Sequence, residues 1–402
     1  MRLRPAGPPF AAAWQAWRED GAADGVRDGF HLLDTTMLYG PMTGGVARYL
    51  REKRAWLARH TRLRHTLVVP ALRDGVGPYG EILVRTHALT RAAYRWPWDA
   101  PRWVREIVAR APDLIEAGDP GPLGWMALHA ARRLGVPLVS FCHSDVVRLV
   151  GQRHGAVCAA FVQQYARLFY RRCDVVVAPS RYMAGRLREW GVGRVVVRPL
   201  GVDLDTFSPQ RREPDIRRQL GLPRATRVLV YAGRLVPEKN IDVLLDAFRR
   251  LGRGYHLIVA GAGDVLPWQA NVTHVRYVEA ARDLARLLAS ADALVHAGDQ
   301  ETFGLILLEA MACGRGVVAP AAGSAPEVVG PEAGILVRPR DGRALADGIQ
   351  AVYDVGYETL GARARRRVEQ LYSWDAAMRG LLDTYRAARA PALLQLPTYA
   401  AS

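Results

Sequence analysis

The sequence has few cysteines and no long apolar run. Its four cysteines, at positions 142, 158, 173 and 313, form no C-x-x-C pair, and no Cys/His spacing matches a zinc site. We therefore expect a protein of a reducing, cytoplasmic compartment. No stretch reaches the roughly 18–20 consecutive apolar residues that a membrane-spanning helix needs. The basic first 20 residues have neither an uninterrupted apolar segment nor a clear cleavage site, so they do not predict a signal peptide.

Acidic residues are outnumbered. The chain has 39 Asp and Glu against 55 Lys and Arg, which gives a net charge of +16 and a pI near 10.2. This excess suits a polyanionic partner such as nucleic acid, an anionic membrane or a phosphorylated substrate. It does not choose among them, because arginine usage also follows the base composition of the genome.

The order of apolar and amphipathic segments predicts an α/β fold. The chain has 402 residues, half of them hydrophobic, which is enough for two domains. From residue 31 onward, short apolar runs alternate with longer amphipathic stretches, a pattern typical of a parallel sheet covered by helices on both faces. Strands are expected at 31–39 and 63–71 with a helix at 44–60 between them, and the same rhythm restarts at 227–235.

We predict two Rossmann-like, doubly wound domains that face each other across a cleft. The segment 195–215, rich in Pro, Gly and charge, is interpreted as the hinge. The predicted divisions are an N-terminal extension at 1–28, a first domain at 29–200, a second domain at 201–373, and a C-terminal helix and tail at 374–402 that packs back on the first domain. Ligands of such sheets bind at the carboxyl ends of the strands.

Two glutamates stand out in the segment GDQETFGLILLEAMACG, residues 298–314. The apolar spacing predicts a helix that begins near Phe303 or Gly304, and its free N–H groups would suit a phosphate. Glu309 lies in an apolar run, so we expect it to be paired or functional, for example as an acceptor for two vicinal ribose hydroxyls. Glu301, on the preceding loop, could reach a sugar hydroxyl. The alternative is that Glu301 caps the helix and Glu309 lies on a solvated face.

A second motif, YAGRLVPEKNIDVLLDAF, covers residues 231–248. Arg234 and Lys239 lie in the expected loop between a strand and a helix that begins near Asn240 or Ile241. Two cations in such a loop could clamp a diphosphate and stabilise charge on a leaving nucleotide. The alternative is that both are ordinary surface cations, of which this chain has many.

Together, GRLVPEKN and ETFGLILLEAMACG resemble the nucleotide-sugar half of the retaining GT-B glycosyltransferases of family 4, and the spaced glutamates match that family's E-x7-E motif. The resemblance extends over most of the chain and is closest in wording to bacterial mannosyltransferases and glycolipid-forming relatives. It implies that Arg234 and Lys239 bind the donor diphosphate, that Glu301 contacts the donor sugar and that Glu309 holds the ribose.

Further positions follow from the resemblance. PMTGGVARYL, at 41–50, resembles the family's glycine loop, and LVSFCHSDVVRLV, at 138–150, resembles the segment with the active-site histidine. The implied catalytic residues are His143, Glu301, Arg234 and Lys239. The implied donor-binding residues also include Gly44, Gly45, Gly261, Tyr277, Val278, Phe303, Gly304, Leu305 and Glu309. Asp145 is a weaker candidate. A lone histidine is more often structural, and paired glycines can form a plain turn.

No metal or cofactor is expected. The D-L-D at 203–205 matches a metal-binding D-x-D by letters, but it lies in the expected hinge, so we interpret it as turn chemistry. The G-A-G at 261–263 does not complete the G-x-G-x-x-G fingerprint of nicotinamide-dinucleotide sites.

The resemblance implies transfer of a hexose from a nucleotide-diphosphate sugar, GDP-mannose or a UDP-sugar, with retention at the anomeric carbon. Arg234, Lys239 and the helix N-terminus would stabilise the leaving diphosphate without a metal. A same-face attack, in which the departing phosphate takes the acceptor proton, leaves His143 to position the sugar. Proton transfer by His143 is the alternative.

The acceptor is expected to be a lipid, a lipid-linked molecule or a glycan. The stretch 48–65 is strongly basic, and 91–110 interleaves aromatics with arginines, which suits the inner face of the cytoplasmic membrane. Ordinary packing of these side chains is the alternative. A soluble small-molecule acceptor and a basic nucleic-acid- or membrane-binding protein without catalysis also remain open. A degenerate sugar-binding fold is disfavoured, because Arg234, Lys239, Glu301 and Glu309 are all retained.

Overall fold

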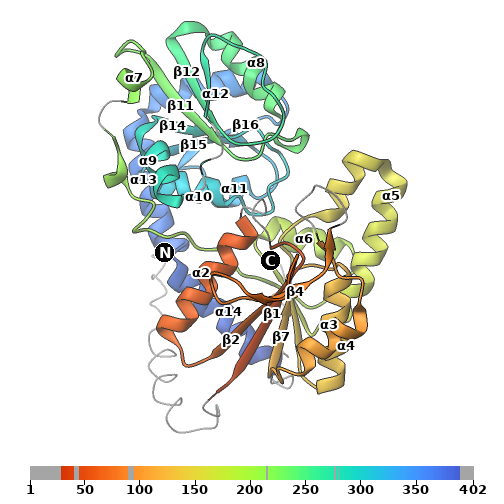
Figure 1. Cartoon of the computed structure of the whole chain (residues 1–402). Helices are drawn as coiled ribbons and strands as arrows, with labels where there is room; N and C mark the ends of the chain where they lie inside the picture. Colours follow the sequence, from red (N-terminus) through yellow and green to blue (C-terminus); the bar gives the residue numbers. More distant parts are fainter. Residues whose placement is uncertain are drawn as a thin grey trace, which may run out of the picture.

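The computed structural model describes residues 29–39, 45–88, 95–213, 216–275, 278 and 280–389. Figure 1 shows two domains, each with a central sheet and helices on both of its faces. The predicted α/β architecture of two doubly wound domains is therefore confirmed.

The first sheet has eight strands in the order β10-β9-β8-β7-β1-β2-β4-β3, parallel except for the final β3–β4 pair. Its central strand β1 pairs His31 with Arg64 of β2 and Leu32 with Leu114 of β7. The strands are β1 (His31–Thr35), β2 (Arg64–Ala71), β3 (Gly75–Val76), β4 (Ile82–Arg85), β7 (Leu114–Ala117), β8 (Leu138–Phe141), β9 (Val175–Ala178) and β10 (Val195–Val197). A separate antiparallel pair joins β5 (His87–Ala88) and β6 (Arg95–Trp96).

The second sheet has six parallel strands in the order β13-β12-β11-β14-β15-β16. These are β11 (Arg227–Ala232), β12 (Tyr255–Ala260), β13 (Val272–Val275), β14 (Ala293–Val295), β15 (Gly316–Pro320) and β16 (Gly334–Val337). The central strands are buried throughout, which explains their near-continuous apolar sequences.

Helices cover both sheets. In the first domain they are α2 (Gly45–His60), α3 (Ala100–Val108), α4 (Pro122–Leu134), α5 (Val146–Tyr170) and α6 (Arg181–Glu189). In the second they are α7 (Ile216–Gln219), α8 (Ile241–Leu251), α9 (Ala281–Ser290), α10 (Leu305–Ala312), α11 (Ala325–Val329), α12 (Gly342–Val355) and α13 (Tyr357–Leu371). Single 3-10 turns lie at η1 (Pro209–Arg211), η2 (Pro237–Lys239) and η3 (Gly252–Gly254). Among the described residues, no helix is long and apolar enough to cross a membrane.

Alternate residues of each strand enter different cores. Leu32 belongs to a cluster that extends across both domains, whereas the next residue, Leu33, packs on the opposite face of the first sheet. Val228 and Leu229 divide in the same way in the second sheet. Because one apolar cluster contains residues of both domains, the two sheets share a continuous core at their junction.

The expected hinge is shorter than 195–215. Its first residues form β10, which pairs with β9 at the edge of the first sheet. The crossing itself lies near Gly201, where a Cβ atom would come within 2.6 Å of the Trp374 backbone, so the outgoing and returning chains touch here. Val202 pairs with Ser373 in the same crossing.

The last helix, α14 (Trp374–Arg389), packs against the first domain. The indole N–H of Trp56 donates to Asp375 over 2.8 Å, and the Tyr385 hydroxyl donates to Glu116. Arg198, just after β10, donates to the carbonyl oxygen of Gly380 over 2.6 Å. The first domain is therefore completed by the end of the described chain.

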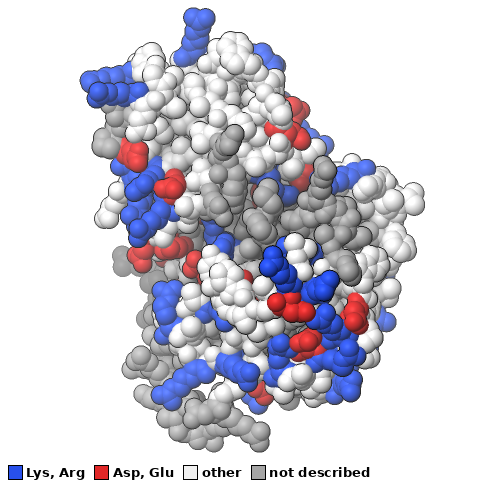
Figure 2. Space-filling view, in the orientation of Figure 1, with Lys and Arg blue, Asp and Glu red and all other residues white. Residues whose placement is uncertain are grey.

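Part of the basic, aromatic stretches expected to face a membrane is built into the fold. Trp56 and Trp103 are buried, and Lys53 is sealed inside the first domain. Trp98 remains exposed, while residues 91–94 lie outside the described part of the chain. Burial therefore favours the packing alternative for the two buried tryptophans. On the face shown in Figure 2, Lys and Arg side chains occur on both domains and are mixed with acidic ones.

Candidate functional site

A cavity of about 340 Å³ lies between the two domains. The first domain contributes Gly45, Arg48 and His143 to its wall. The second domain contributes its strand-end loops and the first turn of α10. This position agrees with the general rule that ligands of open α/β sheets bind beyond the carboxyl ends of the strands.

The N-terminus of α10 forms one wall of this cavity. Gly304 precedes the helix with φ of 83°, a left-handed conformation that favours glycine, and a Cβ there would meet Leu307 at 2.9 Å. No side chain caps the helix. Because Phe303, Gly304 and Leu305 all line the cavity, the positive end of the helix faces the space where a phosphate could bind.

Glu309 lies one turn into α10 and is 3% exposed, which excludes the alternative of a solvated face. It forms an ion pair with Arg48 of α2, so this contact joins the two domains. Burial raises the pKa of Glu309, and the opposing charge of Arg48 only partly offsets that effect. Arg48 also lies over the Phe207 ring, with 5.8 Å to the ring centre.

Glu301 lies in a cluster of charged and polar groups. It forms an ion pair with Lys239, and Nε2 of His296 lies 2.9 Å from its Oε1 atom. Burial would raise the pKa of Glu301, but Lys239 and His296 outweigh that effect and hold it well below its usual range. Glu301 is therefore ionised, and it does not cap α10 as the alternative required.

Arg234 lies on the loop after β11, and its side chain is half exposed. Its guanidinium is 3.6 Å from Glu238, and its carbonyl oxygen accepts a 2.9 Å hydrogen bond from Tyr231. This second bond fixes the loop backbone while leaving the guanidinium at the cavity wall.

His143 follows β8 and faces the same cavity. Its ring stacks on Phe141, with ring centres 4.3 Å apart and planes inclined by 8°, and its Nε2 atom is buried without a hydrogen-bond partner. Burial, reinforced by the nearby charge of Lys53, lowers the pKa of His143 to about 3. The imidazole is therefore neutral near pH 7.

Beneath the first-domain wall lies an ion network with no opening to the cavity. Lys53 is fully buried and lies 2.7 Å from Asp34 and 2.9 Å from Glu116. Nε2 of His65 lies 2.9 Å from Oδ2 of Asp34, and the Tyr385 hydroxyl donates to Oε2 of Glu116. Burial would raise the pKa of Asp34, but Lys53 and His65 lower it to about 2.

Several polar contacts hold the domains together around the cavity. The Thr302 hydroxyl donates to the carbonyl oxygen of His143 over 2.9 Å. The Ser180 hydroxyl donates to the backbone carbonyl oxygen of Thr302 over 2.7 Å. Arg148, on α5, lies 3.3 Å from Asp299. The loop that contains Glu301 is thus tied to the strand-end loop that contains His143.

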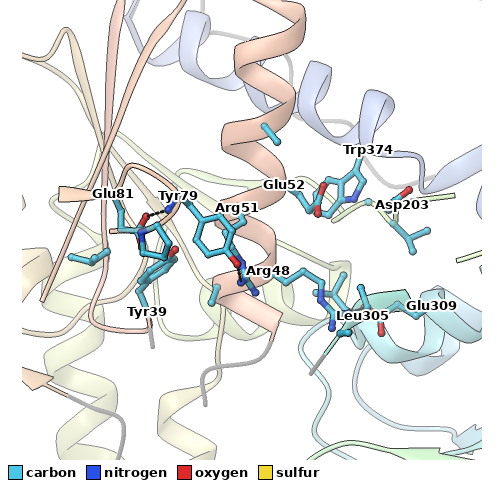
Figure 3. A pocket seen from close by; sticks show the side chains of 18 of the residues that line it. Tyr39, Arg48, Arg51, Glu52, Tyr79, Glu81, Asp203, Leu305, Glu309 and Trp374 are labelled. Atoms are coloured by element: carbon cyan, nitrogen blue, oxygen red, sulfur yellow. Dashed lines mark hydrogen bonds and ion pairs between the residues drawn. The ribbon is translucent and has the colours of Figure 1, made fainter. Parts of the chain in front are cut away.

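A larger cavity of about 960 Å³ adjoins the first, and the two share Arg48, Leu305 and Glu309 in their walls (Figure 3). Its other walls combine charged and aromatic side chains. These include Tyr39, Arg51, Glu52, Tyr79, Glu81, Arg95, Asp203 and Trp374. Figure 3 shows Arg51 beside Tyr79, whose hydroxyl accepts its 3.2 Å hydrogen bond. Burial raises the pKa of Glu52, and the nearby Asp203 adds to this rise.

The structure brings most of the predicted site residues to the smaller cavity. Those in its wall are His143, Arg234, Lys239, Glu301, Glu309, Gly45, Val278, Phe303, Gly304 and Leu305. Gly261 is not among the lining residues. A Cβ there would come within 2.0 Å of the Gly233 carbonyl oxygen, so Gly261 lies behind Gly233, which does line the cavity. Gly44 and Tyr277 lie outside the described residues.

Sequence reasoning missed two site residues. Arg48 is one of many arginines on α2, and only the packing of the domains brings it to Glu309. His296 had a usable signal, because it is a polar residue directly after the buried strand β14, where loop residues of such sheets meet their ligands.

The D-L-D segment behaves as a turn. One oxygen of Asp203 accepts hydrogen bonds from the backbone N–H groups of Asp205 and Thr206, both over 3.0 Å. Across the described part of the chain, no group of three or more His, Cys, Asp or Glu side chains is arranged to hold a metal ion.

Comparison with known proteins gives the same division into halves. Residues 43–206 match the family described as Glycosyltransferase Family 4, and residues 226–354 match Glycosyl transferases group 1. A GDP-mannose-dependent alpha-mannosyltransferase of Mycobacterium tuberculosis is 31% identical over 297 residues, which cover 72% of this chain and 76% of that protein. A D-inositol 3-phosphate glycosyltransferase of Xylanimonas cellulosilytica is 31% identical, over 66% of this chain and 69% of that protein.

Solved structures show the same architecture. Sucrose-phosphate synthase of Thermosynechococcus elongatus matches with a TM-score of 0.77 at 24% identity, over 90% of this chain and 99% of that one. HepE of Anabaena, in complex with UDP and glucose, matches with a TM-score of 0.70 at 19% identity, over 89% of this chain and 99% of that one. At these identities the likeness establishes the fold.

Proposed function

Because the chain belongs to family 4 of the GT-B glycosyltransferases, we propose that it transfers a hexose from a nucleotide-diphosphate sugar to a hydroxyl of its acceptor, with retention at the anomeric carbon. One observation carries the proposal: Lys239, Glu301, Glu309 and His143 all line a single cavity at the N-terminus of α10.

In this proposal the donor lies in the smaller cavity. The diphosphate binds between Arg234, Lys239 and the free N–H groups of α10, which together offset the charge that develops as the glycosidic bond breaks. Glu309 accepts hydrogen bonds from two ribose hydroxyls, and ionised Glu301 contacts the sugar. The ion pair between Lys239 and Glu301 holds both groups in place at the cavity wall.

The neutral state of His143 bears on its role. A group with a pKa near 3 is a poor acceptor for the proton of a sugar hydroxyl at neutral pH, so its contribution is to position the sugar. The departing phosphate then takes the acceptor proton on the same face, which gives retention. Arg234, Lys239 and the helix end supply the positive charge of this mechanism, and no metal is invoked.

The acceptor binds in the larger cavity, next to the donor. Its wall of arginines, carboxylates and aromatic rings suits a polyhydroxylated group. Relatives include an alpha-mannosyltransferase and a phosphatidylinositol dimannoside mannosyltransferase, both GDP-mannose-dependent by name. We therefore favour GDP-mannose as donor and the sugar headgroup of a lipid or lipid-linked glycan as acceptor, at the cytoplasmic face of the membrane.

A soluble acceptor is the second candidate. It is supported by the relative named D-inositol 3-phosphate glycosyltransferase, whose similarity is of the same size. The larger cavity fits a small free polyol as readily as a headgroup, so the acceptor assay must include both.

Donor binding is the first test. Thermal shift and calorimetry with GDP, UDP, ADP and their sugar conjugates should show stabilisation by one base, with loss in Lys239→Met and Glu309→Gln. The exposed Arg253→Met is the matched control and should bind as the wild type does. If no nucleotide binds, or both cavity variants bind normally, the proposed function is wrong.

A further inference from the structure

Helix α5 projects from the first domain beside the second domain (Figure 1). It has two arms, because Gly155 interrupts the helix with φ of 83° and ψ of 175°. The arms approach closely at Gly151, where a Cβ would meet that of Ala159 at 3.2 Å. The segment is thus a short helical hairpin, and its second arm packs one face on α4 through Tyr165 and Phe169, both against Trp125.

A neighbouring face of the second arm is exposed and carries three large apolar side chains beside the polar Gln164. Val157, Phe161 and Leu168 are 84%, 74% and 50% exposed. Their spacing of four and seven residues places all three on one side of a helix. Figure 2 shows the outer part of this projection as mainly uncharged. Large apolar side chains that are exposed together on one face mark an interaction surface.

The charge around this face has one sign. From Val146 to Cys173 the sequence has no Asp or Glu, although the chain as a whole has 39. Arg153 and His154 lie at the turn of the hairpin, and Arg171 and Arg172 lie at its base, all exposed. An apolar face between cationic ends suits the boundary between acyl chains and anionic headgroups, where Phe and Val enter and Arg remains at the surface.

The hairpin also lies next to the proposed site. Arg148 of its first arm is 3.3 Å from Asp299, and Arg153 is 4.0 Å from Glu238, which is next to Lys239 in the loop after β11. A membrane held by the outer face of α5 would therefore be close to the opening between the domains.

We propose that the exposed face of α5, formed by Val157, Phe161 and Leu168 with the flanking arginines, is the surface with which the protein docks on an anionic membrane. This inference rests on the lipid-acceptor form of the proposed function and names its partner. It places the docking surface away from the stretches 48–65 and 91–110, whose tryptophans 56 and 103 are buried.

The test is flotation with phosphatidylcholine vesicles, with and without phosphatidylglycerol. The wild type should float with the anionic vesicles, and V157S/F161S should float roughly tenfold less. The matched control is V355S/L371S, which removes two half-exposed apolar side chains from the second domain and should float normally. Trp98→Ser tests the one exposed tryptophan of the basic, aromatic stretch and should also float normally.

Three results would overturn the inference. The wild type could fail to float with either vesicle type, V157S/F161S could float as the wild type does, or Trp98→Ser alone could abolish flotation. Loss of a wild-type dimer or of RNA binding in V157S/F161S, with flotation unchanged, would instead assign the face to a second copy or to RNA. Nucleotide binding, measured on the same samples, separates the proposals: docking without nucleotide binding would leave this inference standing and remove the proposed function.

Discussion

Each domain contains a lysine in an ion pair, Lys53 with Asp34 and Glu116 and Lys239 with Glu301, but the two clusters differ in their access to solvent. Lys53 and its carboxylates are sealed, with side-chain exposures of 0% for the lysine and 1–2% for Asp34 and Glu116. Lys239 and Glu301 are 20% and 14% exposed and line a cavity. The chemistry of the pairs is nearly the same, so the sequence pattern of charges does not distinguish a structural cluster from a ligand site.

The difference in access suggests a difference in what each cluster does. The sealed network pairs its charged groups within the fold and joins strands β1 and β7 to helices α2 and α14. The open cluster leaves part of its lysine and carboxylate for a ligand. A change in the first should therefore affect folding, and a change in the second should affect binding and catalysis.

Removal of the sealed lysine should have the largest effect. Lys53→Met leaves Asp34 and Glu116 buried without a cation, which should lower the free energy of unfolding by about 3–5 kcal/mol. Chemical denaturation measures it. The triple variant with Asp34→Asn and Glu116→Gln should recover much of the loss, because the stranded charges are gone. A Lys53→Met protein as stable as the wild type would show that the network does not stabilise the domain.

Removal of the open lysine should reverse this pattern. Lys239→Met should lower kcat/KM of sugar transfer by roughly 10²–10³-fold, since it withdraws charge stabilisation from the leaving diphosphate. The pair is partly exposed, so the free energy of unfolding should change by less than about 1 kcal/mol. Steady-state kinetics and denaturation on one preparation test both halves. A stability loss as large as that of Lys53→Met would erase the contrast between the clusters.

Glu309→Gln sharpens the comparison within the open site. It keeps the shape of the side chain but weakens its hydrogen bonds to ribose, so nucleotide affinity should fall by about 1.5–3 kcal/mol. Calorimetry with the nucleotide and its 2′,3′-dideoxy analogue tests whether Glu309 binds the ribose hydroxyls. The variant and the wild type should bind the analogue with similar affinity. If the variant loses equal affinity for both nucleotides, Glu309 does not hold the ribose.

His143 lies between the two clusters and should show the smallest effect. Its folded pKa of about 3 is below the value of 6.5 in the unfolded chain, so the unfolded state binds more protons as the pH falls below 6.5. Its contribution to stability is thus fully present above pH 6.5 and is lost progressively toward pH 3. His143→Phe should reduce the fall in the free energy of unfolding between pH 7 and 5 by about 2 kcal/mol. If the free energies of unfolding of the wild type and the variant fall equally with pH, the pKa of His143 is not lowered in the folded protein.

Much of the fold could be predicted from the sequence, because buried parallel strands and amphipathic helices leave strong periodic signals. The helix expected at 44–60 is α2, and the strand expected at 63–71 is β2. The signal was weaker where elements are short or mixed with loop residues. Strand β10 was interpreted as part of the hinge because Pro and Gly follow it directly, and the strand expected at 31–39 ends at Thr35.

The site could be predicted only for residues that share a motif along the chain. Arg234, Lys239, Glu301 and Glu309 belong to two such motifs and line one cavity. Arg48 could not be found in this way, because its partner is 261 residues away and only the docking of the domains brings them together. The exposed face of α5 was missed for another reason: apolar spacing along a helix normally indicates a buried face, and only the structure shows which side is covered.

The return of α14 to the first domain bears on how the protein is made. Residues 29–200 leave the ribosome long before Tyr385 and Asp375, yet Glu116 and Trp56 depend on these two late residues for their hydrogen bonds. During synthesis, α14 can therefore dock on the first domain only after the second domain has been synthesised. The last helix of the chain thus completes the domain that is synthesised first. A nascent chain that is halted before Trp374 should therefore remain bound to chaperones.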